Sequence, residues 1–144
     1  MKLYLDNCMF NRPYDDQSNL KVLLESEAKL KIQEDIRAGV YELVWSYILD
    51  YENNKNPFLE RKEQIAKWKV YTKIDIEADE NIINLANSIN HLGLKKFDSL
   101  HIACAIKANA DYFLTTDIGI IKKANLIQAI NIKDPIDFIR ELLA

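Results

Sequence analysis

Two acidic residues in the stretch 94–117 have the types and positions that could do chemistry. Asp98 follows a basic lead-in and precedes an Ala-rich apolar run, residues 100–108, which predicts a buried helix with a carboxylate in its first turn. Asp117 follows an aromatic and apolar run, residues 112–114, which predicts a strand with a carboxylate just past its carboxyl end. Parallel α/β sheets bind ligands beyond the carboxyl ends of their strands. Two acids delivered to that edge favour a bound cation.

Two more acids are expected at the same edge. Asp6 ends an apolar run, residues 2–5, that predicts the first strand. Glu52 lies on the helix expected after the second strand, and its spacing from Leu49 and Ser46 places these side chains on one face. Carboxylates that converge repel one another unless a cation neutralises them, and hard oxygen ligands favour Mg²⁺ or Mn²⁺. The acids therefore predict a site for one of these ions.

The remaining metal-binding residue types do not point to zinc. The chain has no CxxC pair, and His91 and His101 lie on different predicted helices. His101 falls one turn after Asp98, on an otherwise apolar helix, so we expect it to be packed or hydrogen-bonded in the core. Cys104 lies on the same helix and is also expected in the core.

Each acid also has an ordinary structural explanation. Asp6 could merely end its strand, and Asp98 could complement the dipole of its helix. Asp117 could cap the next helix. Glu52 has other acids close to it in the sequence and could be a surface residue of its helix. What favours a joint role is that all of them fit one edge of one fold.

Helices alternate with strands along the chain, and this order is what must position the acids. Gly and Pro number only three each, so helix should dominate. The alternation predicts one domain, a three-layer α/β/α sandwich with a mostly parallel central sheet. Right-handed crossovers then place all the strand carboxyl ends at one edge. The expected strands are residues 2–5, 40–45, 73–76, 112–114 and 126–132, and the expected helices are residues 19–38, 46–53, 56–71, 78–92, 98–108, 119–124 and a terminal helix from Pro135.

Apolar spacing predicts which side chains two of these helices bury. The first long helix is expected to bury a four-residue series, and the terminal helix an apolar face of its own. Three aromatic residues, by contrast, are expected at the surface, where they pair two copies of the chain or else turn into the core. The buried series are Leu20, Leu24, Ala28, Ile32 and Ile36, then Ile136, Ile139, Leu142 and Leu143, and the aromatic residues are Phe58, Trp68 and Tyr71.

Composition limits the class of protein. A chain of 144 residues with 49% hydrophobic and 28% charged residues is typical of one soluble globular domain. A net charge of −3 argues against nucleic-acid binding by bulk electrostatics, although an acidic pocket attracts phosphate once it holds a metal ion. No apolar stretch approaches the ~20 residues of a membrane span. No targeting segment is visible, and the two cysteines read as reduced thiols, so we expect a cytoplasmic protein with no membrane partner.

Four segments, taken together, resemble the PIN-domain family of small metal-dependent nucleases, which includes VapC-type toxins. The segments are an early strand that ends in Asp, residues 3–6; a serine-led SYILDYE, residues 46–52; a D-x-L-H-x-A-x-A helix, residues 98–105; and the strand end ADYFLTTD, residues 110–117. The resemblance spans nearly the whole chain, and the last two segments are its specific part. The chain departs from the pattern at Cys8, where the family often has a small hydroxyl or Asn, which puts one hydrogen bond near the metal in question.

The resemblance implies phosphodiester hydrolysis of single-stranded RNA by a Mg²⁺- or Mn²⁺-dependent ribonuclease. Asp6, Asp98 and Asp117 would hold one or two ions, which lower the pKa of a bound water and stabilise charge on the reacting oxygens. Glu52 would hold the second ion or orient the water. The family also implies a toxin with an antitoxin partner, and a homodimer.

Other residues near these acids are candidates for supporting roles. Threonine hydroxyls beside a carboxylate cluster can orient ligands or water. Basic side chains can contact phosphates, which positions a strand without reading its sequence. The candidates are Thr115 and Thr116 for the first role and Arg12, Lys95, Lys96, Lys122 and Lys123 for the second.

Three other functions compete with this interpretation. A phosphotransfer receiver would need an acidic pair after the first strand, but Asp6 stands there alone. A haloacid-dehalogenase-like phosphatase would need D-x-D-x-[TV], which the chain lacks after Asp6. The third alternative is a PIN fold kept as a non-catalytic nucleic-acid-binding or regulatory module.

Overall fold

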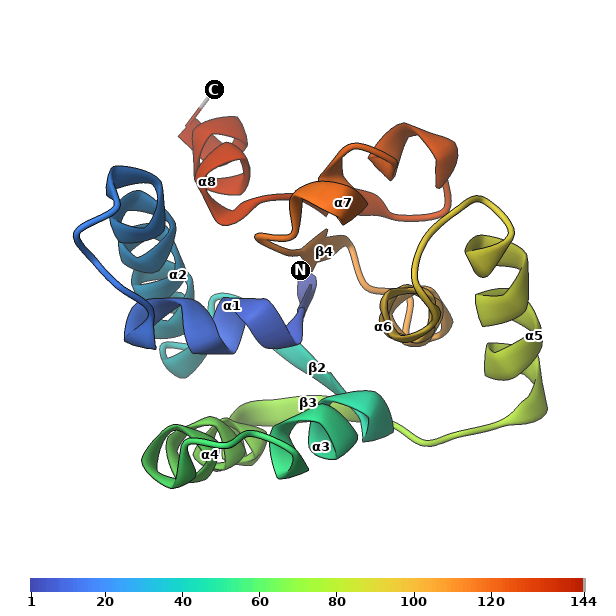
Figure 1. Cartoon of the computed structure of the whole chain (residues 1–144), viewed down its shortest axis with the longest axis horizontal. Coiled ribbons are helices and arrows are strands. Elements are labelled where there is room, and N and C mark those ends of the chain that lie inside the picture. Colours follow the sequence, from blue (N-terminus) through green and yellow to red (C-terminus); the bar gives the residue numbers. More distant parts are fainter. Residues whose placement is uncertain (144) are drawn as a thin grey trace.

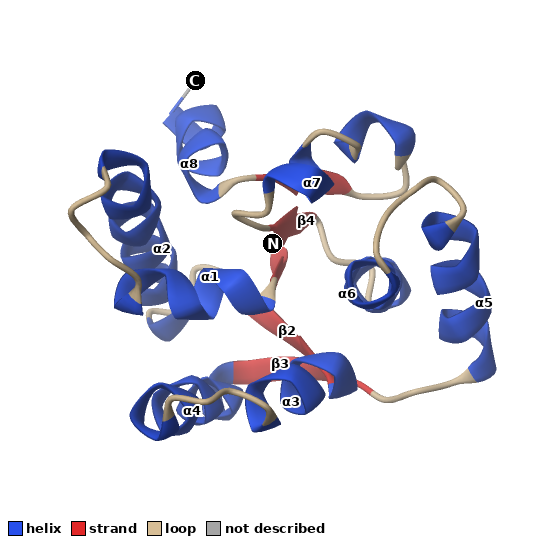
Figure 2. Cartoon of the chain, viewed as in Figure 1, coloured by secondary structure: helices blue, strands red, loops and turns tan. Residues whose placement is uncertain are grey.

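A five-stranded, wholly parallel sheet forms the middle of the molecule. The computed structural model describes residues 1–143, and helices flank the sheet on both sides (Figures 1 and 2). The strand order is β3-β2-β1-β4-β5, so β1 is central and the chain turns outward from it in both directions. This confirms the predicted α/β sandwich. The strands are β1 (Lys2–Leu5), β2 (Glu42–Ser46), β3 (Thr72–Ile76), β4 (Tyr112–Leu114) and β5 (Asn131–Lys133).

The helices cover the sheet in two groups. In Figure 1, α2 and α8 lie on one side of the sheet, and α5 and α6 lie on the other. No helix within residues 1–143 is long and apolar enough to cross a membrane. The helices are α1 (Asn7–Asn11), α2 (Leu20–Arg37), α3 (Tyr47–Asn54), α4 (Leu59–Lys67), α5 (Glu80–Asn90), α6 (Lys96–Lys107), α7 (Ile118–Ile121) and α8 (Pro135–Leu143), with 3₁₀ turns η1 (Arg12–Tyr14), η2 (Trp68–Tyr71) and η3 (Ala124–Leu126).

Local signals in the sequence set the ends of several helices. The Asn19 side chain accepts a hydrogen bond from the Val22 amide and so caps α2. Ser46 caps α3 in the same way, as expected. Gly39 follows α2 with a φ of 79°, a conformation that favours glycine and that ends the helix there.

Two predicted elements are wrong in extent. Residues 126–130 are not strand, because the ladder with β4 begins only at Asn131, and the buried Ile127 and Ile130 pack on the core from irregular chain. The helix expected over residues 56–71 begins at Leu59 and ends in the 3₁₀ turn η2.

The buried face of α2 is not the predicted one. Leu20 and Leu24 are 67% and 48% exposed, while Glu25 and Lys29 are buried. Glu25 is buried because it pairs with Arg12 of η1, at 3.4 Å from the guanidinium Nε. Lys29 is also buried, and its ammonium lies over the rings of Phe10 and Trp68 in the core. Only the last part of the predicted series, Ile32 and Ile36, reaches the core.

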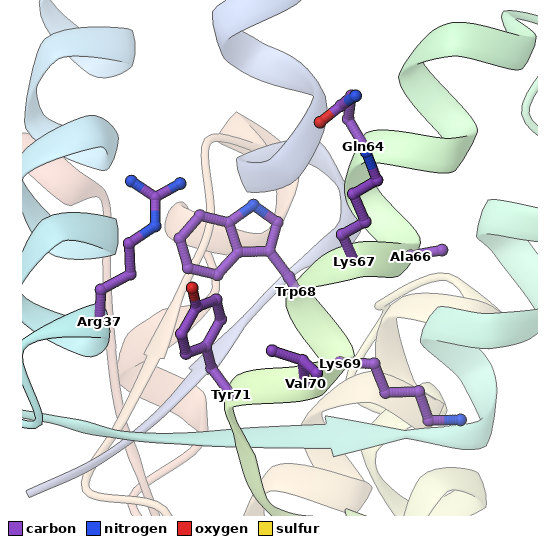
Figure 3. A pocket seen from close by; sticks show the side chains of 8 residues that line it. All are labelled: Arg37, Gln64, Ala66, Lys67, Trp68, Lys69, Val70 and Tyr71. Atoms are coloured by element: carbon purple, nitrogen blue, oxygen red, sulfur yellow. The ribbon is translucent and has the colours of Figure 1, made fainter.

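The side chains that α8 and η2 bury also differ in part from those expected. Leu142 and Leu143 of α8 are exposed, and α8 buries Pro135 and Phe138 instead. Of the two positions expected for Trp68, surface or core, the structure has the core: Trp68 is 8% exposed, with the Arg37 guanidinium 4.6 Å from its ring centroid. Trp68, Tyr71 and Arg37 line a hollow of about 680 Å³ (Figure 3). This hollow adjoins the amino end of β3, away from the edge where the acids were predicted.

Candidate active site

The central strand and its neighbour place two of the predicted acids side by side. Asp6 directly follows β1 and Asp117 follows β4 by three residues, and these strands pair in parallel with Leu5 opposite Leu114. The Asp6 amide continues the ladder and donates to the Leu114 carbonyl at 3.0 Å. Both acids therefore leave the sheet at its carboxyl edge, as the sequence predicted.

Thr115 joins these two acids. Its buried hydroxyl donates to Asp6 Oδ2 at 2.8 Å and accepts from the Asp117 amide at 3.1 Å. The Cys8 thiol lies 3.4 Å from Asp6 Oδ2 and 3.3 Å from Thr115 Oγ1, so the hydrogen bond that the departure at Cys8 put in question is present in a weak form. Burial is the main cause that raises the pKa of Cys8, and the charge of Asp6 raises it further. The thiol therefore stays protonated.

A chain of hydrogen bonds crosses the core and reaches Glu52. The His101 ring bonds to the Glu52 carboxylate through Nε2 and to the Tyr4 hydroxyl through Nδ1, at 2.6 Å for the second bond. The Tyr4 hydroxyl in turn lies 2.6 Å from Ser46 Oγ. Because an ionised carboxylate only accepts, Nε2 carries the proton that it shares with Glu52. His101 is thus a buried, hydrogen-bonded histidine, as expected, and it holds Glu52 at the site.

The structure also separates Glu52 from the acids near it in the sequence. Asp50 is bonded to Trp45 Nε1 at 2.9 Å and to the Lys69 ammonium at 2.9 Å. Glu42 is exposed and begins β2, at the opposite edge of the sheet. Glu52 is therefore the acid of this region that faces Asp6, since His101 Nε2 is also 3.8 Å from Asp6 Oδ1.

Sequence reasoning missed Tyr4. It lies in the first strand two residues before Asp6, and side chains two apart on a strand point to the same face. The signal that could have identified Tyr4 is its hydroxyl. It stands among apolar strand residues and on the same face as the candidate ligand Asp6.

The four acids interact electrostatically. Burial raises the pKa of Asp98 to about 6, and the charges of Asp6, Asp117 and Glu52 add to that rise, while His101 opposes it. Among the ion pairs within residues 1–143, none joins a Lys or Arg to any of the four. Hard oxygen donors that crowd together without a protein counter-charge suit Mg²⁺ or Mn²⁺. The residues therefore suit the predicted ion in type and in charge.

The carboxylates are at present directed toward protein donors. Asp117 Oδ1 accepts from the Gly119 amide at 2.7 Å and caps α7, as Glu52 accepts from His101. Across residues 1–143 no three His, Cys, Asp or Glu side chains are arranged so that they could hold a metal ion as they lie. Ion binding would therefore need the acidic side chains to rearrange from the positions that they have here.

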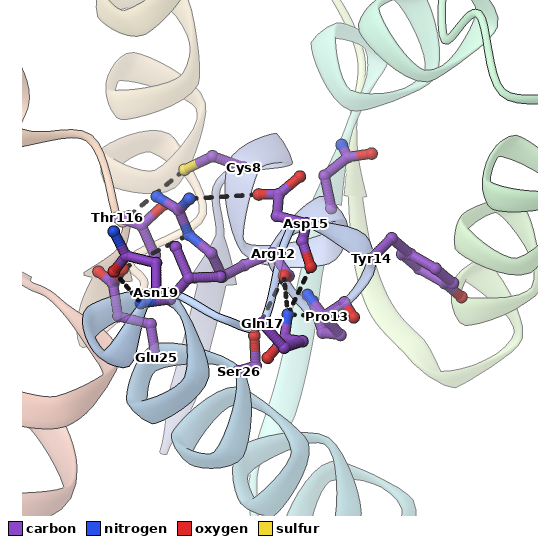
Figure 4. Close-up of polar contacts among 12 residues, drawn as sticks. Cys8, Arg12, Pro13, Tyr14, Asp15, Gln17, Asn19, Glu25, Ser26 and Thr116 are labelled. Atoms are coloured by element: carbon purple, nitrogen blue, oxygen red, sulfur yellow. Dashed lines mark hydrogen bonds and ion pairs between the residues drawn. The ribbon is translucent and has the colours of Figure 1, made fainter.

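The predicted basic residues are placed in different ways. Arg12 is paired with Asp15 at 3.2 Å and with Glu25, so its charge is largely used in joining η1 to α2 (Figure 4). Lys95 and Lys123 line a hollow of about 120 Å³ together with Asp98, although Lys123 Nζ also donates to the Gly93 carbonyl at 2.7 Å.

The other predicted contacts are less close to the acids. Lys96 lines a separate hollow of about 360 Å³ between α5 and α6, and Lys122 is exposed after α7. Thr116 is buried, and its amide donates to Cys8 Sγ at 3.4 Å. Its hydroxyl has no hydrogen-bond partner among residues 1–143.

The Tyr4–His101 contact can be tested through stability. We expect Tyr4→Phe to lower the free energy of unfolding by about 1–3 kcal/mol, because it leaves the buried Nδ1 atom of His101 without its partner and removes a hydrogen bond from Ser46. Urea denaturation measures the change. Tyr112→Phe is the matched control, since its hydroxyl bonds to the exposed Glu141 and its loss should cost less. Equal losses in both variants would contradict a special role for the Tyr4 hydroxyl.

Two solved structures share this fold at low sequence identity. One is a chain of VapBC2 from Rickettsia felis, crystallised with a DNA fragment from their promoter; it has a TM-score of 0.56 and 14% identity over 93% of this chain and 98% of that one. The other is a chain of VapBC-1 from nontypeable Haemophilus influenzae, with a TM-score of 0.54 and 16% identity over 94% of this chain and 98% of that one. No protein-family model and no curated protein matches the chain. The likeness confirms the PIN-like fold.

Proposed function

We propose that this protein is a PIN-domain nuclease that hydrolyses single-stranded RNA with Mg²⁺ or Mn²⁺. The observation that carries the proposal is that Asp6, Glu52 and Asp117 all act on the charge of Asp98 near the carboxyl edge of the sheet, and that within residues 1–143 no Lys or Arg forms an ion pair with any of the four. The PIN-like fold supports it, because VapBC chains have the same fold.

The side chains divide the work of hydrolysis. Asp6, Asp98 and Asp117 would hold the ion, which when bound lowers the pKa of a water molecule and neutralises charge on the phosphate. Thr115 keeps Asp6 oriented through its hydrogen bond. Glu52, held by His101, can accept a proton from the attacking water or serve a second ion.

We extend the proposal to a toxin that an antitoxin protein restrains. The two solved structures named above are of VapBC proteins, which supports a protein partner. A small protein encoded next to this chain should then co-purify with it and suppress RNA cleavage in proportion to its amount. If RNA is cleaved equally well with that protein bound, the toxin part of the proposal is wrong. The homodimer stays a prediction from the resemblance.

Metal removal provides the main test. We expect the protein to cut short single-stranded RNA when Mn²⁺ or Mg²⁺ is present and to stop when a chelator is added, with activity restored by excess metal. Gel analysis of end-labelled RNA measures this, with duplex RNA and single-stranded DNA compared at the same concentrations. Tight RNA binding without cleavage under every metal condition would favour the non-catalytic module instead.

A further inference from the structure

A small polar groove opens directly beside the acid group. It has a volume of about 260 Å³ and lies among α1, α3 and the start of α4. Glu52 forms part of its wall, and so does Asn7, which follows Asp6 in the sequence. A ligand in this groove would therefore touch the site and extend away from it.

Two cations line the groove. Lys55 is exposed, with its ammonium 4.3 Å from the centroid of the Tyr51 ring. The Arg61 side chain is 18% exposed, and its guanidinium donates to the Tyr14 carbonyl at 3.0 Å and lies 3.6 Å from Asp15. These contacts hold both charges in the groove whose wall Glu52 shares. Such an arrangement suits the phosphate of a residue next to the one that the acids act on.

Phe58 adds an aromatic surface. It is 57% exposed although it is a large apolar side chain, and the Arg61 guanidinium lies 4.4 Å from its ring centroid. An exposed ring joined to a guanidinium is the surface on which unpaired bases stack, since every base has a flat π face. The groove thus combines stacking and charge in one place.

An unused acceptor completes the groove. The Asn7 Oδ1 atom is buried and has no hydrogen-bond partner among residues 1–143. Asn56, across the groove, donates through Nδ2 to Asn11 Oδ1 at 3.2 Å, so it is already held in place. Native structures leave few buried acceptors unpaired, and a donor from a bound molecule would satisfy Asn7.

We propose that this groove binds one unpaired nucleotide of the substrate, next to the scissile phosphate. Its base stacks on Phe58 and Arg61, Lys55 contacts its phosphate, and Asn7 Oδ1 accepts from its amino or hydroxyl group. The groove is smaller than usual ligand pockets, which measure ~300–1,000 Å³. Its size suits one nucleotide and excludes a nucleic-acid duplex. This inference rests on the proposed nuclease function, and it predicts a preference for single strands because a paired base cannot leave its stack without cost.

Binding in the absence of hydrolysis tests the subsite. In an Asp98→Asn background, we expect Phe58→Ala to weaken binding of a fluorescent single-stranded oligonucleotide by roughly 5- to 150-fold, the usual worth of one stacked base. Phe58→Trp should restore binding, and Phe58→Leu should not. Tyr71→Ala is the matched control, since Tyr71 is an exposed aromatic residue at the other edge of the sheet.

A salt titration gives an independent readout. Lys55→Gln should reduce the slope of log K against log salt by about 0.7, as expected for the loss of one phosphate contact to a single strand. Unchanged affinity in Phe58→Ala, or equal losses in Phe58→Ala and Tyr71→Ala, would overturn the subsite. So would a Phe58→Ala variant that loses only self-association or partner binding.

The two proposals fail in different ways. If the wild type cleaves RNA and Phe58→Ala binds it normally, the nuclease stands and the subsite is wrong. If Phe58 governs RNA binding and no metal supports cleavage, the subsite stands and hydrolysis is wrong. An Asp98→Asn protein that binds no oligonucleotide at all overturns the subsite as well.

Discussion

Asp98→Asn is expected to remove RNA cleavage while making the metal-free protein more stable. The loss of activity should reach about 10²–10³-fold or more, the scale seen when one group that stabilises transition-state charge is removed. The amide keeps the size of the side chain, so the packing of the first turn of α6 is unchanged. Initial rates with Mn²⁺ measure the effect.

The gain in stability has an electrostatic cause. Burial and the nearby carboxylates raise the pKa of Asp98 from 3.8 to about 6, so the ionised form is disfavoured in the folded state at neutral pH. Each pKa unit corresponds to about 1.4 kcal/mol, and after allowance for the water that reaches Asp98 the substitution should add about 1–2 kcal/mol. Because the folded-state pKa is raised, wild-type stability should fall as pH rises from about 4 to 6, and the variant should lose less over that range.

A matched variant separates this effect from helix capping. Glu80→Gln removes an acid from the first turn of α5, where the other acids do not crowd it. It should cost about a few tenths of a kcal/mol through the helix dipole and leave activity intact. Added Mn²⁺ should raise the melting temperature of the wild type by mass action and that of Asp98→Asn much less. A destabilised Asp98→Asn protein would contradict the account given for the acid group.

Lys29→Met should give the largest gain in stability. Lys29 is buried on α2, with its ammonium 5.3 Å from the Phe10 ring centroid and 5.6 Å from that of Trp68. Burial, with a smaller contribution from the Arg37 charge, lowers its pKa from 10.5 to about 7. A charged Lys29 therefore opposes folding at neutral pH and below. Met keeps the length of the side chain, and after loss of the cation–π contacts the net gain should be about 1–3 kcal/mol at neutral pH.

The stability of the wild type should depend on pH in a direction that the shifted pKa of Lys29 determines. The unfolded chain keeps the Lys29 proton up to the ordinary pKa of 10.5, and the folded chain releases it above about 7. Between these values the unfolded state binds more protons, so wild-type stability should rise with pH. Urea denaturation across that range should show the rise in the wild type and a flatter profile in Lys29→Met. Lys31→Met is the control, because Lys31 is exposed and paired with Asp35 at 3.1 Å; a rise of equal steepness in Lys29→Met would contradict the assignment.

The strand ends were predictable because they depend on local pattern. A buried strand followed by an acid is visible in the sequence at Asp6 and Asp117, and the parallel order of elements brings such ends to one edge. The first turn of α6 was visible in the same way. The general position of the acids therefore followed from periodicity and topology alone.

What could not be predicted depends on partners far apart in the sequence. The face of α2 is decided by Arg12, which makes burial of Glu25 possible, and by the aromatic rings that receive Lys29. Helical spacing favoured the leucines because it takes account of hydropathy but not of these partners. The role of Tyr4 is hidden for the same reason, since its bond to His101 spans 97 residues.

The pairing of β1 with β4 also sets the time at which the acids can meet during synthesis. Leu5 lies beside Leu114, and the Thr115 hydroxyl that orients Asp6 comes 109 residues after it. A nascent chain that has left the ribosome only as far as α5 contains Asp6 and Glu52 but neither Asp98 nor Asp117. Domains fold as units once their long-range pairs are available. The proposed nuclease would therefore have no complete acid group until residue 117 has been translated, so a growing chain could not yet cut the message that encodes it.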